Sequence, residues 1–338
     1  MLSSKQADVG ISCKPTTTAL GEMPEAGDKR KAEDDKHKGF GKLILFGEHF
    51  VVYKVPALVA AVSDYTACSV KLSAGAGVTT VDDRPAVPGY KVEKKDEGDQ
   101  ATALVLKHMG VDTEKQAVEV KFGGNLTAVS GIGASAAACV SLARAVAEAQ
   151  GKELTEEEIN AAGYEGEKGY HGTPSGIDNT AATYGGCLRF QRTDGDPKFT
   201  TKKLKQSVEI VYASTGITAS TSKVVGDVRA KKEADEAWFG ALLAKYEALV
   251  AKGEAALDGA DWPALAVLLN ENHALCQELT VSCKELDSLV DAARAAGAPG
   301  AKMSGTGRGG LMLALTPGAA LQDKVAEALK VPPPSPSY

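Results

Sequence analysis

A glycine-rich segment that runs directly into an alanine-rich one constrains the fold of this chain more than any other feature. It spans residues 123–138 and reads Gly-Gly-Asn-Leu-Thr-Ala-Val-Ser-Gly-Ile-Gly-Ala-Ser-Ala-Ala-Ala. Glycines let backbone N–H groups turn toward an anion, and a helix that begins after them directs its positive end to the same place. The segment therefore predicts a phosphate-binding turn followed by a helix over about 134–150.

Two other interpretations of this segment stay open. Its residues also satisfy the dinucleotide fingerprint G-x-G-x-x-A at Gly131, Gly133 and Ala136. A strand predicted over 117–122 precedes the motif, but such a fingerprint normally opens the first β-α-β unit, and several predicted strands come earlier here. The remaining interpretation is a turn that leads into a tightly packed helix and binds no ligand.

Residues 41–53 form a second informative segment, Gly-Lys-Leu-Ile-Leu-Phe-Gly-Glu-His-Phe-Val-Val-Tyr. Lys42 lies at the start of an apolar run typical of a buried strand, and Glu48 and His49 follow where that run breaks. By themselves, a Glu and a His at such a break are typical of an exposed turn.

Residues 302–311 form a third glycine-rich segment. They match G-x-G-x-x-G at Gly305, Gly307 and Gly310. The run Leu-Met-Leu-Ala-Leu that follows is typical of a strand and not of a helix, so the argument from a helix dipole does not apply. We therefore predict a turn between two strands that packs closely on another backbone.

Glu167 and Asp178 lie on either side of a Gly- and Pro-rich loop, Glu167 near the end of a predicted helix and Asp178 just after the turn. Without other information this pattern indicates a helix end and an exposed aspartate. The sequence lacks G-x-x-x-x-G-K-[ST], H-R-D, D-F-G, H-E-x-x-H and G-x-S-x-G. P-loop, protein-kinase, zincin and α/β-hydrolase mechanisms therefore lack their essential residues.

Length and charge limit the remaining classes. A chain of 338 residues corresponds to roughly two domains. Lys plus Arg number 38 against 44 Asp plus Glu, and the net charge of −6 argues against a dedicated nucleic-acid surface. No apolar run reaches the ~18 residues of a membrane span. The cysteines show no zinc-ligand spacing, and we expect most of them to be reduced and buried: Cys13, Cys68, Cys139, Cys187, Cys276 and Cys283.

The composition changes along the chain. Residues 1–39 lack periodicity and are rich in charge and small polar residues, so we expect them to be disordered. We place a first domain at 40–205, a second at 206–331 and a Pro-rich tail at 332–338. Mixed strands and helices with adjacent hairpin-like strands favour an α+β fold.

Periodicity and turn residues predict the individual elements. Capping-box patterns at 155–158 and 282–285 are each expected to begin a helix. The predicted strands cover 43–46, 50–53, 57–62, 68–72, 117–122, 185–190, 208–213, 301–303 and 311–315, and the predicted helices cover 100–109, 134–150, 155–168, 219–252, 262–279, 283–296 and a segment ending at 330.

In this order, four segments resemble motifs of the GHMP kinases, a family that includes galactokinase, homoserine kinase, mevalonate kinase and phosphomevalonate kinase. The resemblance covers about residues 40–330. Residues 130–138 are similar to the family's phosphate loop, and 302–310 look like its third motif. Residues 41–52 and the run Gly-Thr-Pro-Ser-Gly-Ile-Asp-Asn at 172–179 are most similar to the mevalonate kinase branch, since galactokinases read G-E-H-T-D-Y in the first motif.

The resemblance implies a two-lobed α+β fold of the GHMP-kinase type, with the active site in the cleft between the lobes. It implies phosphorylation of the C5 hydroxyl of (R)-mevalonate by ATP with Mg²⁺, a step toward isoprenoid and sterol precursors. By the same resemblance, Asp178 is the catalytic base with Lys42 as its partner, and Ser135 and Glu167 are Mg²⁺ ligands. It places ATP on Gly131, Ile132, Gly133, Ala134, Ser135 and Ala136, and mevalonate on Glu48, His49 and Thr221.

The sequence departs from the family's motifs at three places. One is Tyr53-Lys54, which replaces the common His-Gly after the first motif, and the other two lie in the glycine-rich segments. Ala134 stands where the first of two serines is usual, so only Ser135 of that pair can supply a hydroxyl. Arg308 replaces a glycine of the third motif, where it would either clash with a close backbone approach or lend a cation to the nucleotide phosphates.

Three alternatives accompany this interpretation. They are another GHMP enzyme such as a phosphomevalonate kinase or a galactokinase-like enzyme, a nicotinamide oxidoreductase, and a catalytically inactive, ligand-sensing relative. The presence of Lys42, Ser135, Glu167 and Asp178 together argues against the last. We expect small-molecule substrates, no nucleic-acid or membrane partner, and by default a cytosolic location, and we allow for a homodimer.

Overall fold

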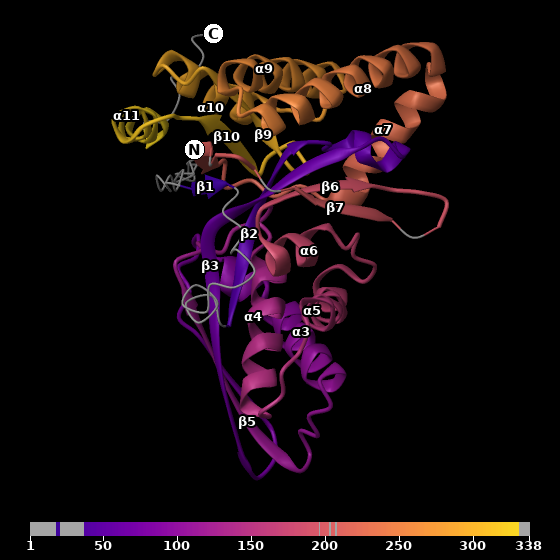
Figure 1. Cartoon of the computed structure of the whole chain (residues 1–338). Coiled ribbons are helices and arrows are strands. Elements are labelled where there is room, and N and C mark those ends of the chain that lie inside the picture. Colours follow the sequence, from indigo (N-terminus) through magenta and orange to yellow (C-terminus); the bar gives the residue numbers. More distant parts are fainter. Residues whose placement is uncertain (1–17, 21–36, 196, 203, 207, 331–338) are drawn as a thin grey trace, which may run out of the picture.

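A computed structural model describes residues 18–20, 37–195, 197–202, 204–206 and 208–330. Within these residues the strands form two β-sheets, which lie at different levels of the molecule (Figure 1). The N-terminal sheet and its helices make up the lower part in this view, and the C-terminal sheet and its helices the upper part. The arrangement is the two-lobed α+β fold expected from the sequence.

One long strand, β3 (Ala57–Ala74), organises the N-terminal sheet, where the sequence predicted two shorter strands. Tyr65 pairs with Phe40 and Thr66 pairs with Gly124, so the residues between the two predicted strands stay extended. The other strands of this sheet are β2 (Lys38–Phe46), β4 (Val78–Asp82), β5 (Gln116–Gly124), β6 (Cys187–Gln191) and β7 (Lys198–Lys202), of which β4 and β7 were not predicted.

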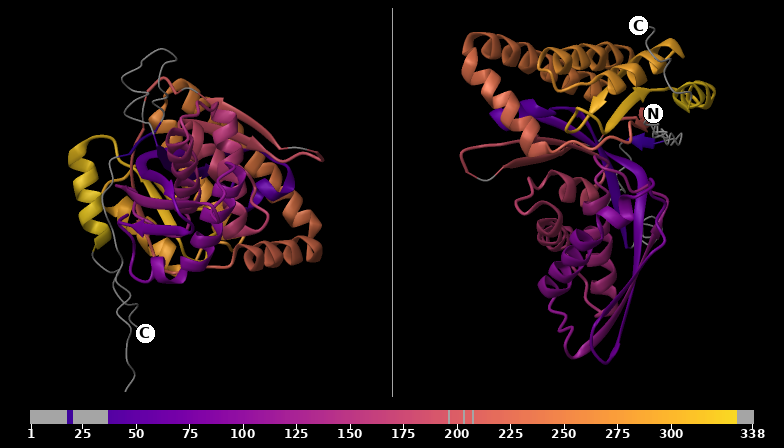
Figure 2. Two further views of the ribbon diagram at one scale, coloured as in Figure 1. Left: turned by 90° about the horizontal axis from the view of Figure 1, so that it is seen from below. Right: turned by 180° about the vertical axis from the view of Figure 1, so that it is seen from behind.

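The helices of the N-terminal part lie to one side of this sheet (Figure 2). Helix α4 packs on β3 and on α5, and it is rich in alanine because these elements approach closely. A Cβ added at Gly163 or Gly166 of α5 would lie 2.7 Å or less from a side-chain atom of its neighbours. The helices are α2 (Tyr90–Glu93), α3 (Lys95–His108), α4 (Ala134–Ala149), α5 (Glu156–His171), α6 (Ile177–Tyr184) and the 3₁₀ helix η1 (His49–Tyr53).

The C-terminal sheet has the strand order β1-β8-β10-β9, with antiparallel pairing throughout. Helix α9 packs on β9, and α10 packs on both β9 and β10. The elements are β1 (Thr18–Leu20), β8 (Val208–Ser214), α7 (Thr221–Ala234), α8 (Glu236–Gly259), α9 (Trp262–Glu278), α10 (Lys284–Ala295), β9 (Gly300–Ser304), β10 (Leu311–Leu315) and α11 (Ala319–Lys330).

The expectation of disorder for residues 1–39 is wrong at two places. Thr18–Leu20 pair with β8, and Lys38 and Gly39 belong to β2. Without β1, β8 would be the edge of its sheet, and the unpaired main-chain groups of an edge can pair with almost any sequence. Composition therefore did not reveal this contact. The other residues of that segment, and the tail at 332–338, lie outside the described residues.

Residues 50–53 form part of η1 and not the predicted strand. Gly47 has a φ of +135° and ends the extended backbone, and the Val51 N–H donates to the Gly47 carbonyl at 2.8 Å. The apolar character of this segment serves packing on α8, because Phe50 stacks on Tyr246 with the ring centroids 4.3 Å apart.

The two capping-box patterns behave differently. Thr155 and Glu158 exchange both hydrogen bonds of a capping box and begin α5 as predicted. At 282–285 a helix also begins as predicted, since α10 starts at Lys284, but the capping box does not form. Cys283 is the N-cap without a side-chain bond, and the Ser282 hydroxyl donates to Asp287 instead.

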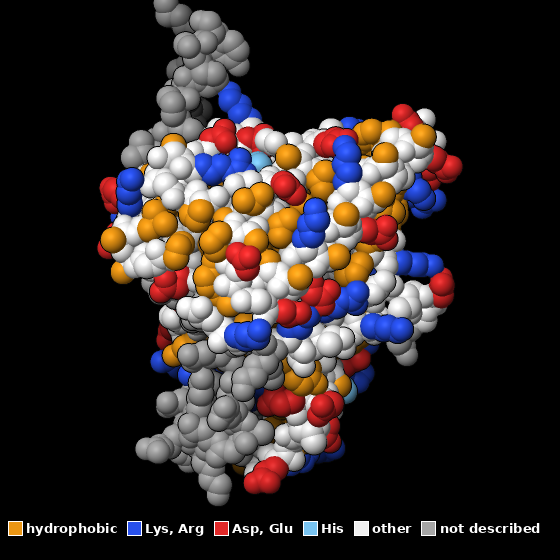
Figure 3. Space-filling model, turned by 45° about the horizontal axis from the view of Figure 1, so that its top comes forward, with side chains coloured by type: hydrophobic (Ala, Val, Ile, Leu, Met, Phe, Trp, Pro, Cys, Tyr) orange, Lys and Arg blue, Asp and Glu red, His pale blue; other side chains and the backbone are white. Residues whose placement is uncertain are grey.

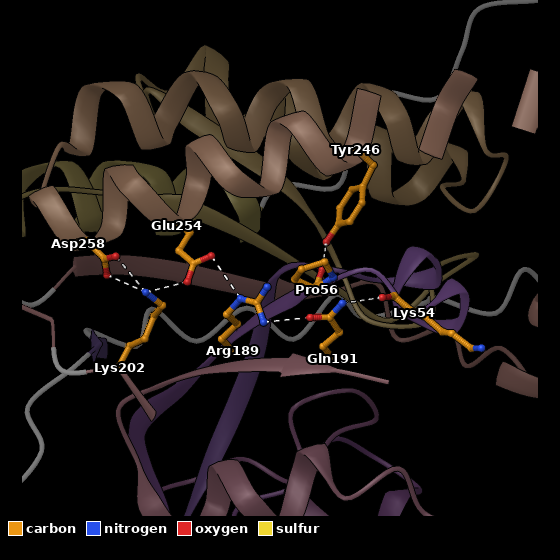
Figure 4. Close-up of polar contacts among 8 residues, drawn as sticks. All are labelled: Lys54, Pro56, Arg189, Gln191, Lys202, Tyr246, Glu254 and Asp258. Carbon is orange, nitrogen blue, oxygen red and sulfur yellow. Dashed lines mark hydrogen bonds and ion pairs between the residues drawn. The ribbon is translucent and has the colours of Figure 1, made fainter. Parts of the chain in front are cut away.

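The two parts share one apolar core, and polar contacts tie them together at its edge. Phe46 and Phe50 from the N-terminal part belong to the same buried cluster as Leu242 and Tyr246 of α8. At the edge, Arg189 and Lys202 on β6 and β7 pair with acidic side chains on α8, and Tyr246 donates to the Pro56 carbonyl at 2.7 Å (Figure 4). These contacts join the two parts of the chain next to the cleft described below.

The described surface mixes charges. Lys and Arg side chains alternate with Asp and Glu on the face over the C-terminal helices (Figure 3). Among the described residues no helix has both the length and the apolar character needed to cross a membrane.

Candidate active site

A cleft with a volume of about 1000 Å³ is lined by both parts of the chain. The N-terminal part contributes β2, η1, a phosphate loop (residues 129–135) and the start of α6, and the C-terminal part contributes the start of α7 and the β9–β10 turn. Ile132 and Ala136, which the resemblance placed on ATP, are fully buried and are not among the residues that line the cleft. The predicted site residues on the cleft wall are Lys42, Glu48, His49, Gly131, Gly133, Ala134, Ser135, Glu167, Asp178 and Thr221.

The phosphate loop has the conformation that its glycines permit. Gly131 and Gly133 have φ angles of +98° and +77°, and Gly133 is the N-cap of α4. The Lys42 N–H donates to the Ile132 carbonyl at 2.7 Å and holds the loop against β2. A Cβ at Gly133 would lie 3.0 Å from Cγ of Lys42, so a side chain there would press on that lysine. The N-terminus of α4 therefore faces the cleft, as an anion site requires.

Lys42 and Asp178 form an ion pair beside this loop. Nζ of Lys42 lies 3.4 Å from Oδ1 of Asp178 and donates to the Gly131 carbonyl at 3.0 Å. The Lys42 side chain is 6% exposed and that of Asp178 is 30% exposed, so the carboxylate stays open to a ligand. The sequence analysis placed Asp178 just after a loop, whereas it lies in the first turn of α6, where the helix dipole favours a negative charge.

Glu167 is a buried carboxylate that fits a cation. It is 1% exposed, and its Oε1 has no hydrogen-bond partner. Burial and the negative charge of Asp178 raise the pKa of Glu167 to about 8, while the Ser135 hydroxyl and the Lys42 ammonium oppose this rise. A divalent cation beside Glu167 would offset the cost of burying its charge.

Further ligands of such a cation can be hydroxyl, water or substrate oxygens. In the part of the chain that the structure describes, no cluster of three or more His, Cys, Asp or Glu side chains could hold a metal ion. Hydroxyl, water and phosphate oxygens are suitable ligands for Mg²⁺, which usually keeps several waters. The Ser135 hydroxyl, on the first turn of α4, is one such oxygen.

Glu48 directs its carboxylate away from open solvent. It forms an ion pair with Lys302 of β9, and both side chains are 0% exposed. Burial raises the pKa of Glu48, although the charge of Lys302 and a hydrogen bond from it act in the opposite direction. Lys302 also donates to the Met303 carbonyl. The pair thus joins the first motif to the third across the two parts of the chain.

His49 and Thr221 meet the β9–β10 turn at the cleft wall. Nε2 of His49 lies 2.6 Å from the Thr306 carbonyl, so this nitrogen carries the proton. Burial lowers the pKa of His49, which favours the neutral ring and leaves the unpartnered Nδ1 as an acceptor. The hydroxyls of Thr221 and Thr306 are hydrogen-bonded at 2.8 Å.

The third motif is the turn between two strands that the sequence predicted. Its close approach is made by two glycines, since a Cβ at Gly307 would lie 2.0 Å from the Val281 carbonyl oxygen and one at Gly309 would lie 2.6 Å from that of Ile217. Arg308 takes neither of the roles considered for it. Its side chain pairs with Asp227 of α7, and it is not among the residues that line the cleft.

Several cleft residues were not singled out in the sequence analysis, among them Tyr90, Lys94, His171 and Arg192. Each is a residue type that is frequent on protein surfaces, and none belongs to a recognisable sequence motif. Arg192 follows directly after β6, and a cation at a strand end carries no signal by itself. His171 could have been found from its spacing, because it lies one helical turn after Glu167 with Nε2 3.7 Å from that carboxylate.

Comparisons with known proteins show the family to which this chain is similar. The models of the GHMP kinases N terminal domain and the GHMP kinases C terminal match residues 99–186 and 254–331. The mevalonate kinase of Thermococcus gammatolerans is 32% identical over 311 residues, covering 86% of this chain and 91% of the relative. The crystal structure of L. major mevalonate kinase in complex with R-mevalonate matches with a TM-score of 0.86 and 42% identity, covering 96% of this chain and 95% of that one.

A more distant match shows the fold alone. Streptococcus pneumoniae phosphomevalonate kinase, in complex with phosphomevalonate and AMPPNP, has a TM-score of 0.63 and 16% identity, covering 86% of this chain and 95% of that one. The chain therefore belongs to the GHMP kinases. Within that family, the relatives that it matches at more than 30% identity over most of their length are mevalonate kinases.

Proposed function

We propose that the chain is a mevalonate kinase, which transfers the γ-phosphoryl group of ATP to the C5 hydroxyl of (R)-mevalonate. The observation that carries the proposal is the Lys42–Asp178 pair beside the phosphate loop in an open cleft. The 42% identity to a mevalonate kinase bound to R-mevalonate supports the choice of acceptor. ATP as co-substrate follows from membership of the GHMP kinases.

The geometry supports a separate part of the reaction for each group. Phosphoryl transfer needs positioned phosphates, charge neutralisation and an oriented acceptor hydroxyl. Backbone N–H groups of residues 131–135 hold the ATP phosphates at the N-terminus of α4. Asp178 accepts the proton of the acceptor hydroxyl, and Lys42 fixes Asp178 and offers positive charge to the group in transfer.

We also propose that Ser135 and Glu167 hold Mg²⁺. The unpartnered, buried oxygen of Glu167 supports this assignment, as does the position of both side chains on the cleft wall. When bound, the ion would supply positive charge that neutralises the charge of the phosphates.

Replacing Glu167 with Gln is expected to lower the apparent Mg²⁺ affinity by at least about 10-fold, because the ligand loses its charge. Ser135→Ala should have a smaller effect that high Mg²⁺ rescues, since water can take the place of the hydroxyl. Initial rates against free Mg²⁺ at saturating ATP measure both. Glu165→Gln is the control, because Glu165 lies on the same helix and pairs with Lys168. An unchanged Mg²⁺ dependence of Glu167→Gln would show that Glu167 is no ligand.

Mevalonate carries a carboxylate, which a cation on the cleft wall would bind. Arg192 lines the cleft directly after β6, and it takes part in no ion pair within the described ranges. The neighbouring Gln191 donates from Nε2 to the Lys54 carbonyl at 2.9 Å, which puts this end of β6 beside η1 (Figure 4). We therefore propose Arg192 as the partner of the mevalonate carboxylate.

Arg192→Met is expected to raise KM for mevalonate about 10- to 100-fold, the cost of a lost charge-assisted hydrogen bond. KM for ATP should stay unchanged. Steady-state kinetics in both substrates test this, with Arg189→Met as the control, because Arg189 lies three residues away and pairs with Glu254 instead of facing the cleft. Equal changes in the two KM values would contradict the assignment.

A coupled assay of ADP release tests the function itself. Mevalonate, phosphomevalonate, homoserine and galactose are offered separately with ATP and Mg²⁺, and we expect efficient turnover with mevalonate. Turnover with phosphomevalonate or galactose in its place would favour the alternative of another GHMP enzyme. A cytosolic location and a homodimer stay predictions that this assay does not address.

A further inference from the structure

Arg84 is a buried cation that lies outside the catalytic constellation. It is 7% exposed, and its guanidinium lies over the Phe122 ring. Two of its nitrogens bond the carboxylate of Asp82 as a fork, Nε at 2.9 Å and Nη2 at 2.8 Å. The remaining nitrogen, Nη1, donates to the Ala134 carbonyl at 3.1 Å. Ala134 is the first residue of α4, directly before Ser135, so Arg84 contacts the far end of the phosphate loop.

The segment that carries Arg84 also contacts the near end of the loop. The Ala128 N–H donates to the Pro85 carbonyl at 2.7 Å, and the Val87 N–H donates to the Ala128 carbonyl at 3.1 Å. Ala86 and Ala128 form an isolated parallel bridge. Residues 84–87 therefore hold the backbone on both sides of residues 129–133, by main-chain bonds at one end and by the Arg84 side chain at the other.

We propose that Arg84 is a positioning residue for ATP. It acts by fixing the distance between the two ends of the phosphate loop. The inference rests on the proposed function, because it assumes that this loop binds the ATP phosphates. Arg84 is not among the residues on the cleft wall, so it does not bind the nucleotide itself. Its effect passes through the Ala134 carbonyl to the N–H groups that face the phosphates.

The chemistry of the contact requires arginine. A planar guanidinium can bond a carboxylate with one edge and a carbonyl with the other, whereas a lysine ammonium cannot reproduce this fork. A cation is unfavourable near a helix N-terminus. Asp82 neutralises the charge of Arg84 there, so the positive end of α4 stays available to a ligand.

Arg84→Lys is expected to weaken binding of a non-hydrolysable ATP analogue, and to raise KM for ATP, by about 10- to 100-fold, because small displacements of binding groups have effects of this size. KM for mevalonate should change by less than about 2-fold. Arg144→Lys is the matched control. Arg144 lies on α4, the helix that begins with Ala134, but far along it from the phosphate loop. It pairs with Glu156 and donates to the Thr183 carbonyl at 2.9 Å.

Binding of the analogue is measured by calorimetry without mevalonate, so the result does not depend on the acceptor. If the unchanged protein binds no ATP analogue, the proposed function fails. If it binds and Arg84→Lys binds equally well, or if Arg144→Lys weakens binding as much, the inference on Arg84 is wrong. Should Arg84→Lys not fold, Asp82→Asn keeps the arginine and loosens its orientation. Weaker nucleotide binding by Asp82→Asn with an unchanged KM for mevalonate supports the proposal, and unchanged nucleotide binding overturns it.

Discussion

Replacing Asp178 with Asn is expected to lower kcat for mevalonate phosphorylation by about 10²- to 10⁴-fold, the usual contribution of a general base. Asparagine keeps the size of the side chain and part of its hydrogen bonding, but it cannot accept the proton. Binding of ATP should survive, because the phosphate loop and Glu167 are unchanged. Measuring kcat, the Kd for nucleotide and the melting temperature on one preparation separates loss of chemistry from loss of folding.

Lys42→Met serves as the comparison for Asp178→Asn, because we expect it to affect ATP binding as well as kcat. Lys42 contacts both Asp178 and the Gly131 carbonyl, so its loss should lower kcat and also weaken ATP binding. If Asp178→Asn turns over at nearly the normal rate with mevalonate saturating, the mechanism is wrong, while membership of the family stands. If Asp178→Asn loses ATP binding as Lys42→Met does, Asp178 shapes the loop and is no base.

Lys302→Met is expected to lower the free energy of unfolding by about 3–5 kcal/mol, because it leaves the buried Glu48 carboxylate without its partner. Equilibrium unfolding in urea measures the loss. Arg229→Met is the control, since Arg229 and Glu233 form an ion pair with side chains 75% and 61% exposed. Pairs of that kind contribute no more than about 1 kcal/mol.

The pH dependence of the stability loss in Lys302→Met shows whether an unpaired Glu48 charge or a packing defect causes it. Burial raises the pKa of Glu48, so the folded state binds its proton more tightly than the unfolded chain does. Proton binding by Glu48 therefore adds to the free energy of unfolding at low pH, and this contribution is lost as the pH rises. The defect of Lys302→Met should therefore be smaller at about pH 5 than at about pH 8. The double variant Glu48→Leu, Lys302→Met should recover most of the loss. A defect that is equal at both pH values would contradict the account of an unpaired carboxylate.

The parts of the site that the sequence revealed depend on local chemistry. Gly131 and Gly133 indicated a turn before a helix because positive φ angles favour glycine. Thr155 and Glu158 indicated a helix start because a capping box is complete within four residues. In both cases the residues that cause the structure are neighbours in the chain.

The parts that the sequence did not reveal depend on distant partners. Glu48 read as an exposed turn residue because Lys302, which buries it, lies 254 positions later. Residues 50–53 read as a strand because apolar residues that pack on α8 have no distinct local pattern. The pairing of Thr18–Leu20 with β8 uses backbone groups, which every sequence possesses. In each of these cases a tertiary contact decided the conformation.

The apolar core that the two parts of the chain share also limits how the enzyme can move. A clam-shell closure needs a thin connection that bends, but here Phe50 stacks on Tyr246 and Arg189 pairs with Glu254 across the boundary. Enclosure of a substrate therefore has to come from short rim segments such as 173–176 and 218–220, which border the cleft. We therefore expect the catalytic groups to keep their spacing as substrates bind, and loop movements to set the rate of product release.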